Sequence, residues 1–126
     1  MHIGLLAPEF LPNWGGVGTY CIELARALRG DVDLDVITVE RRIYDEPAVT
    51  AREMEAYLGD AVRVHTISKA TDTFLYNAGF QIAVKRYLTR DGGSQGLEIL
   101  HSHHAHMSHL LYGLFGKRLP ILTTLH

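Results

Sequence analysis

Four residues near the amino terminus, Gly15-Gly16-Val17-Gly18, have the types and spacing of an anion-binding turn and precede an amphipathic stretch. A helix that begins there presents unpaired backbone N–H groups and a partial positive charge, and both attract anions. Glycine also lets a bulky phosphate approach the backbone, because it carries no Cβ atom. The turn therefore predicts a ligand that is phosphorylated or linked to a nucleotide.

Histidines gather in a second segment, residues 101–109, which contains five of the eight histidines in the chain. On a strand, His101 and His103 would project to the same face, where imidazole can contact a sugar or a phosphate. Zinc also prefers imidazole, so the segment admits a metal site built from His101, His103, His104 and His106. No acidic residue stands between Glu98 and His126 to share the ligation. A solvated or packed cluster without chemistry is a third interpretation.

Single polar residues beside these two segments are further candidates. Glu9 lies in the loop ahead of the glycines, close enough in sequence for a contact with a substrate. His126 ends the last apolar run, where a strand would place it at the same edge as the glycine turn. Cys21 falls on the apolar face of the first helix, which is typical of a buried small residue.

Glycine and proline divide the apolar residues into segments that alternate between strand and helix periods. Strands are expected at residues 2–7, 34–39, 62–67, 97–102 and 120–125. Helices are expected at residues 17–28, 52–58, 80–88 and 107–115. The apolar face of the first helix is expected to consist of Val17, Tyr20, Cys21, Leu24, Ala25 and Leu28.

This alternation predicts an α/β fold, a Rossmann-like parallel sheet with right-handed crossovers and helices on both faces. The first and fifth strands are the most apolar, so they are expected at the centre of the sheet. Ligands of such sheets bind beyond the carboxyl ends of the strands. The glycine turn, residues 101–104 and His126 are therefore expected to converge on one edge.

A dinucleotide site is an alternative for the glycine turn, because Gly16-Val17-Gly18-Thr19-Tyr20-Cys21 partly fits the G-x-G-x-x-G fingerprint. Glu40, at the end of the second strand, stands where an acid would bind the ribose. Cysteine replaces the third glycine, however, and a long loop with two prolines separates the first strand from the turn. An NAD(P)-binding oxidoreductase domain is therefore the weaker interpretation.

Composition limits the class of protein. The chain has 126 residues, enough for one domain, and 47% of them are hydrophobic. Its net charge of −2 gives no general attraction for nucleic acid. The single cysteine excludes an internal disulfide and suits a reducing cytoplasm, where we expect the protein to work. No apolar run reaches the roughly 18 residues that cross a bilayer, and no secretory leader is apparent.

Three stretches of the sequence, taken in order, carry a family resemblance. The opening comprises Ala7-Pro8-Glu9-Phe10-Leu11-Pro12, Gly15-Gly16-Val17-Gly18-Thr19-Tyr20 and Glu23-Leu24-Ala25-Arg26-Ala27-Leu28. Leu97-Glu98-Ile99-Leu100-His101-Ser102-His103 is similar to a strand end of the form D-hydrophobic-hydrophobic-H-x-H, with Glu98 in place of aspartate. Leu122-Thr123-Thr124-Leu125-His126 is similar to a T-x-H strand. Together they resemble the retaining glycosyltransferases of family four, which are close in kind to glycogen and starch synthases.

The resemblance implies the N-terminal, acceptor-side half of a GT-B fold, whose C-terminal partner would bind the nucleotide sugar. It implies transfer of a sugar, with retention, from a nucleotide-diphosphate sugar to a sugar or lipid-linked acceptor, without a cofactor or a metal. By the same resemblance, the amides of Gly15, Gly16 and Val17 bind the donor diphosphate and His126 is catalytic. Glu9, Tyr20 and His103 would line the acceptor pocket. Since the last strand stops at His126, residues 1–126 are expected to be a fragment that is inactive alone.

Overall fold

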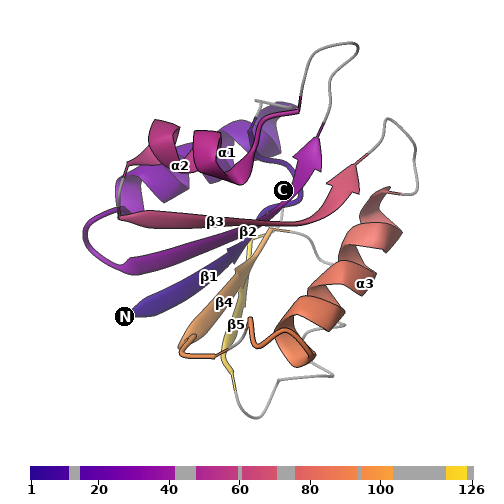
Figure 1. Cartoon of the computed structure of the whole chain (residues 1–126). Helices are drawn as coiled ribbons and strands as arrows, with labels where there is room; N and C mark the ends of the chain where they lie inside the picture. Colours follow the sequence, from indigo (N-terminus) through magenta and orange to yellow (C-terminus); the bar gives the residue numbers. More distant parts are fainter. Residues whose placement is uncertain are drawn as a thin grey trace.

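The computed structural model describes residues 1–11, 15–41, 48–59, 61–70, 76–93, 95–103 and 119–124. Within them, five parallel strands form one sheet in the order β3-β2-β1-β4-β5 (Figure 1). The strands are β1 (His2–Leu6), β2 (Asp33–Arg41), β3 (Val62–Ala70), β4 (Ile99–Ser102) and β5 (Ile121–Thr123). The helices are α1 (Gly15–Leu28), α2 (Ala51–Leu58) and α3 (Tyr76–Thr89). The predicted Rossmann-like parallel sheet is confirmed.

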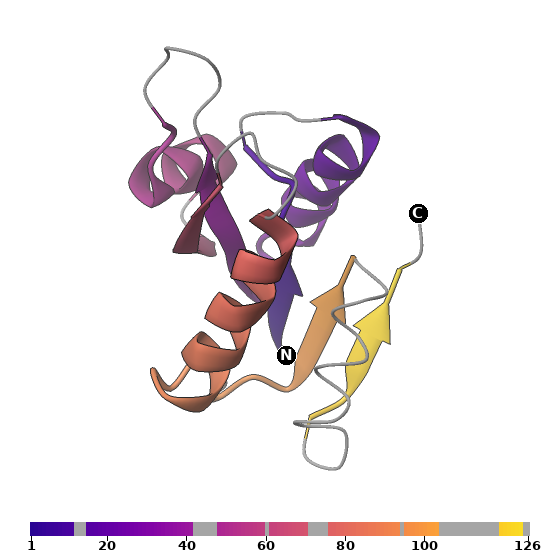
Figure 2. The same cartoon turned by 90° about the vertical axis from the view of Figure 1, so that its right-hand side faces the viewer.

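Two hydrophobic cores, one on each face of the sheet, hold the helices in place (Figures 1 and 2). Adjacent residues of a strand point to opposite faces, so Leu5 packs in one core and Leu6 in the other. The helices α1 and α2 cover the first face through the fully buried Cys21, Ala25, Met54 and Leu58. The helix α3 covers the second face through Phe80, Val84 and Leu88.

Local signals in the sequence fix both ends of α2 and tie this helix to the edge strand. The Thr50 hydroxyl oxygen accepts a hydrogen bond from the backbone N–H of Glu53 at 3.2 Å and so caps the amino end. Gly59 follows the last turn with a φ of 102°, a conformation that favours glycine. Between these ends, the Glu55 carboxylate accepts a hydrogen bond from the Val64 N–H at 2.9 Å, which anchors α2 to β3.

The structure corrects two expectations about α1. Gly15 to Gly18 form the first turn of the helix rather than a loop ahead of it. Of the six residues expected on its apolar face, Cys21 and Ala25 are buried and Val17, Leu24 and Leu28 pack against the same core, whereas Tyr20 is 43% exposed and Ile22 is buried instead. The face keeps the expected i, i+3, i+4 spacing, and Gly18 is buried beside it because it packs against the loop that follows β1.

The position of the fifth strand is also corrected. The strand β5 lies at the end of the described strand order, beside β4, and Leu122 is 55% exposed. A run of apolar residues favours a strand, but it does not show that both faces of that strand are covered.

The predicted helix at residues 107–115 lies outside the described residues. No helix in the described ranges is both long and apolar enough to cross a membrane.

Candidate active site

The amino end of α1 lies at the carboxyl edge of the sheet, because the loop after β1 leads into it (Figure 1). The N–H groups of the first turn have no partner within the helix, and no acidic side chain lies in that turn. Gly16 is exposed, and a Cβ atom at this position would meet no described atom within 4 Å. The turn therefore combines N–H donors that have no partner within the helix, the positive end of a helix dipole and open space beside Gly16 among the described atoms.

The described part of the loop between β1 and α1, residues 7–11, is held near both of its ends. The Ala7 N–H donates to the backbone of β2 at 3.0 Å, and the Thr38 hydroxyl donates to the Ala7 carbonyl at 2.6 Å. At the other end, a Cβ atom on Gly18 would lie 3.5 Å from the Phe10 carbonyl oxygen and 3.7 Å from Cβ of Glu9. The half-buried Glu9 is therefore held beside the first turn of α1.

Cys21 lies beneath this region and is buried in the core. It is fully buried, and burial, followed by the charge of Glu9, raises the pKa of its thiol to about 12. A thiol of that pKa stays protonated at neutral pH and is a poor nucleophile. The prediction of a buried small residue is confirmed.

Four side chains form a second part of the site, which we call the ring column: Tyr20, His103, His101 and Thr124. The Tyr20 ring meets the His103 ring edge to face, with centroids 5.4 Å apart. The His103 and His101 rings lie 4.4 Å apart, and Nε2 of His101 is 2.8 Å from Oγ1 of Thr124. Both histidines are buried, with 8% and 2% of their surfaces exposed for His101 and His103. The column therefore links the carboxyl ends of β4 and β5 to α1.

Most predicted site residues that can be located lie in this one region. Tyr20 contacts His103, Glu9 packs against Gly18, and Gly15, Gly16 and Val17 belong to the same first turn of α1. His126, His104 and His106 lie outside the described residues. Thr124 was not among the predicted site residues. It stands two residues before His126 in the T-x-H motif, and only the pairing of β4 with β5 brings it to His101.

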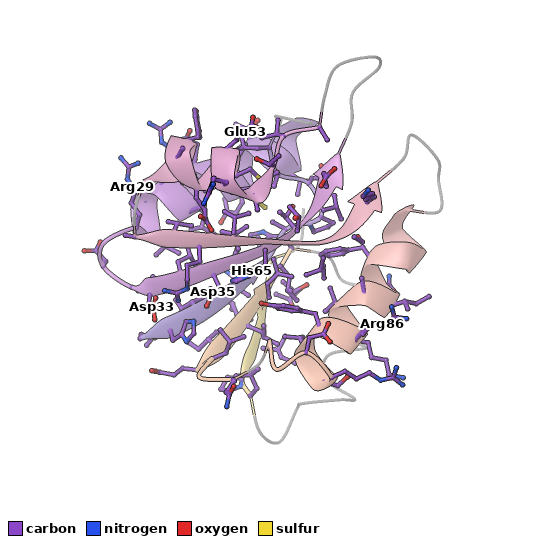
Figure 3. All side chains as sticks on the ribbon, in the orientation of Figure 1. Arg29, Asp33, Asp35, Glu53, His65 and Arg86 are labelled. Carbon is purple, nitrogen blue, oxygen red and sulfur yellow. The ribbon has the colours of Figure 1, made fainter. Side chains whose placement is uncertain are left out.

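A second polar group, the amino-edge cluster, lies at the opposite end of the sheet and consists of His2, Asp33, Asp35, Arg63 and His65. Figure 3 labels three of them, Asp33, Asp35 and His65. The Asp35 carboxylate accepts hydrogen bonds from Nε of Arg63 and Nε2 of His65, both at 2.8 Å, and from His2. Burial alone raises the pKa of Asp35, but the bonds from Arg63, His65 and His2 outweigh it and hold the pKa far below its ordinary range.

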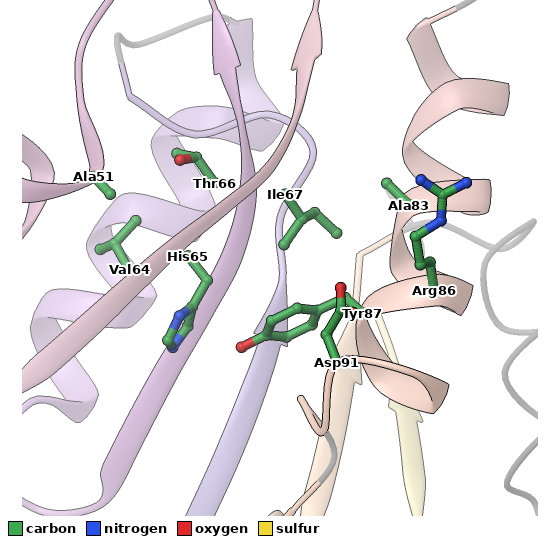
Figure 4. A pocket seen from close by; sticks show the side chains of 9 residues that line it. All are labelled: Ala51, Val64, His65, Thr66, Ile67, Ala83, Arg86, Tyr87 and Asp91. Atoms are coloured by element: carbon green, nitrogen blue, oxygen red, sulfur yellow. The ribbon is translucent and has the colours of Figure 1, made fainter.

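A cavity of about 550 Å³ opens beside this cluster, between β3 and α3 (Figure 4). The His65 and Tyr87 rings face each other across its wall, with centroids 5.6 Å apart. Burial, and then the charge of Asp35, raise the pKa of the Tyr87 hydroxyl. Gly93 packs directly on the Tyr87 ring, since a Cβ atom there would lie only 2.2 Å from Cε1. The Tyr87 ring in the wall of this cavity is therefore packed against His65 and against Gly93.

The described residues also provide evidence on the two alternative functions, a metal-binding domain and an NAD(P)-binding domain. They contain no group of three or more His, Cys, Asp or Glu side chains that could hold a metal ion. Glu40, the residue considered for a ribose, lies inside β2, where its Cα is paired with that of Lys69 in β3. Neither observation favours a metal-binding domain or a nicotinamide site.

The fold and the edge together define a Rossmann-like α/β domain with a helix N-terminus open to an anionic ligand. The family model described as Glycosyltransferase Family 4 matches residues 14–126. The chain therefore belongs to glycosyltransferase family 4. The sequence of no curated protein matches the chain.

Proposed function

We propose that this chain is the N-terminal, acceptor-side domain of a retaining, metal-independent transferase that takes a sugar from a nucleotide-diphosphate sugar. The observation that carries the proposal is the open first turn of α1 at the carboxyl edge of the sheet. A second domain, which would bind most of the nucleotide sugar, completes the enzyme. The family membership and the parallel sheet support this arrangement.

The chemistry follows from the charge that develops during the reaction. When the bond between the sugar carbon and the diphosphate oxygen breaks, negative charge grows on the departing diphosphate. The amides of Gly15, Gly16 and Val17 are fixed donors that stabilise this charge without reorganising, which is electrostatic catalysis. In the proposal they take the part that a divalent metal plays elsewhere. The acceptor hydroxyl oxygen forms the new bond to the sugar, and its proton goes to the leaving phosphate oxygen.

The remaining residues are assigned around this turn. His126 is proposed to contact the transferred sugar, and Glu9, Tyr20 and His103 to form the acceptor side. Tyr20 is the exposed member of these last three, whereas His103 is almost fully covered and lies behind the Tyr20 ring. The proposed acceptor is a sugar or a lipid-linked sugar. The proposed compartment is the cytoplasm.

The first test concerns the phosphate role of Gly16 in the complete enzyme. Gly16→Val is expected to lower the rate of sugar transfer by about 10²–10³-fold or more, because the added side chain would displace the diphosphate from the N–H groups, and losing one well-placed charge-stabilising donor already costs about that much. The fold should survive, because a Cβ atom at Gly16 meets no atom of the described residues within 4 Å. Gly79→Val is the matched control, since Gly79 is an exposed glycine of α3 with equally open space around it.

Steady-state transfer rates and thermal unfolding of both variants decide the outcome. A folded Gly16→Val enzyme that transfers sugar at the parental rate would show that the turn does not hold the diphosphate. In the 126-residue chain, titration with UDP or ADP should shift the amide NMR signals of Gly15, Gly16 and Val17, with weak affinity. Transfer activity in this chain alone would contradict the two-domain proposal.

A further inference from the structure

The ring column runs from the end of β5 to the exposed face of α1. Thr124 hydrogen-bonds to His101, His101 packs on His103, and His103 meets the edge of Tyr20. The backbone supports the same register, because the Thr124 N–H donates to the Ser102 carbonyl at 2.9 Å. Thr124, which directly follows β5, is therefore linked to the exposed Tyr20 through the buried rings of His101 and His103.

Tyr20 stands close to the proposed diphosphate turn. Gly16 and Tyr20 are four residues apart in α1, so they lie one above the other on the same helix face. A long side chain on a helix leans toward the amino end and covers the turn before its own Cα. Both residues are exposed. The Tyr20 ring therefore borders the space over Gly16 that the diphosphate and its sugar would enter.

We propose that His101 and Thr124 are positioning residues that hold Tyr20, by way of His103, as the aromatic wall for the sugar ring beside the diphosphate turn. The inference rests on the proposed function and names residues that act on the site without touching the substrate. A tyrosine supplies a flat apolar surface and one hydroxyl group, which suits a sugar ring with an apolar face and polar edges.

The physical basis is the cost of leaving a surface aromatic ring free to rotate. An exposed ring exchanges rotamers rapidly, and binding would then have to order it. Packing against the buried His103 restricts that motion, and the hydrogen bond to Thr124 fixes the orientation of His101 behind it. A side chain that is locked by packing and by hydrogen bonds behind it binds with less loss of entropy.

The first experiment measures positioning in the 126-residue chain by NMR. Thr124→Val removes the hydroxyl and keeps the shape, so the Tyr20 and His103 ring signals are expected to move and the Tyr20 signals to lose their contacts to His103. Thr124→Ser keeps the hydroxyl and should restore the parental signals. Thr123→Val is the control, because the side chains of consecutive strand residues point to opposite faces.

The second experiment measures the catalytic consequence in the complete enzyme. Thr124→Val is expected to raise the acceptor KM by roughly 2- to 10-fold, the range that corresponds to one hydrogen bond, while kcat changes by less than about twofold. Thr124→Ser should have the parental KM. His101→Phe, which keeps a ring against His103 and removes the nitrogen that meets Thr124, should reproduce the effect if Thr124→Val does not fold.

The outcomes separate the two proposals. If the Tyr20 signals and the acceptor KM both stay parental in folded Thr124→Val and His101→Phe, the positioning role is overturned. If the Tyr20 signals move but the KM stays parental, Tyr20 is not the sugar wall and the inference is likewise overturned. If the parental enzyme transfers no sugar from any nucleotide sugar, the proposed function fails, while the NMR result still decides whether Thr124 and His101 position Tyr20.

Discussion

The amino and carboxyl edges of this sheet both collect polar side chains, but the two collections are built differently. At the amino edge, Asp35 is 8% exposed and accepts hydrogen bonds from three side chains of β1 and β3. At the carboxyl edge, the first N–H groups of α1 have no partner within the helix, and the described atoms leave open space beside Gly16. Charges that are paired within the protein hold strands together, whereas donors without a partner in the helix are able to bind a ligand.

The amino-edge cluster is unusual for the inner face of a parallel sheet, which normally consists of apolar residues. Its members lie on the same face as Leu6 and Ile37 but nearer the amino ends of the strands. The hydrogen bonds from Arg63 to Asp35 and Asp33 join β3 to β2. His2 of β1 hydrogen-bonds to the Asp35 carboxylate as well. The cluster therefore acts as a clamp across three strands, and its effect should appear in stability rather than in ligand binding.

The largest expected effect comes from removing the carboxylate at the centre of this clamp. Asp35→Ala is expected to lower the free energy of unfolding by about 3 kcal/mol, because it leaves Arg63 and two histidines without their shared acceptor. Urea unfolding followed by circular dichroism measures the change. Asp33→Ala is the matched control, since the Asp33 side chain is 52% exposed and its loss should cost less than about 1 kcal/mol.

Equal losses in the two aspartate variants would contradict the distinction between a buried clamp and a surface ion pair. The same variants test the contrast between the edges. Folded Asp35→Ala protein should still show shifts of the Gly15, Gly16 and Val17 amides on titration with UDP. A loss of those shifts in the folded variant would mean that the two edges are coupled.

The second effect is the pH dependence that Asp35 gives to stability. The pKa of Asp35 in the folded protein lies below its value in the unfolded chain, which is about 3.9. Its contribution is therefore fully present above that unfolded value and is lost as the pH falls through the folded pKa. The parental chain should lose stability below about pH 4 more steeply than Asp35→Asn does, as measured by urea unfolding at a series of pH values. Parallel curves for the two proteins would contradict this assignment.

Local patterns were sufficient to predict the parallel sheet, the helices on both faces and the glycine turn at the carboxyl edge. Apolar periods and helix-breaking residues encode these features within short windows of sequence. The amino-edge cluster was not predicted, because His2, Asp35 and Arg63 are far apart in sequence and meet only through the pairing of β1, β2 and β3. The same holds for Thr124 and His101. Tyr20 was expected on the buried face; its exposure and its contact with His103 depend on how the end of β4 lies beside α1.

The smallest expected effects come from two glycines, one near each edge. Gly93→Ala places a Cβ atom 2.2 Å from the Tyr87 ring, so it should lower the free energy of unfolding by about 1–2 kcal/mol as the ring is displaced. Gly16→Ala adds a methyl group that meets no atom within 4 Å in the part of the chain that the structure describes, and it removes backbone freedom from the unfolded chain. It should raise the free energy of unfolding by roughly 0.5 kcal/mol. In thermal unfolding, the melting temperature should therefore fall for Gly93→Ala and rise for Gly16→Ala. A Gly16→Ala chain that is destabilised as much as Gly93→Ala would show that the space over the first turn of α1 is filled by protein and closed to a ligand.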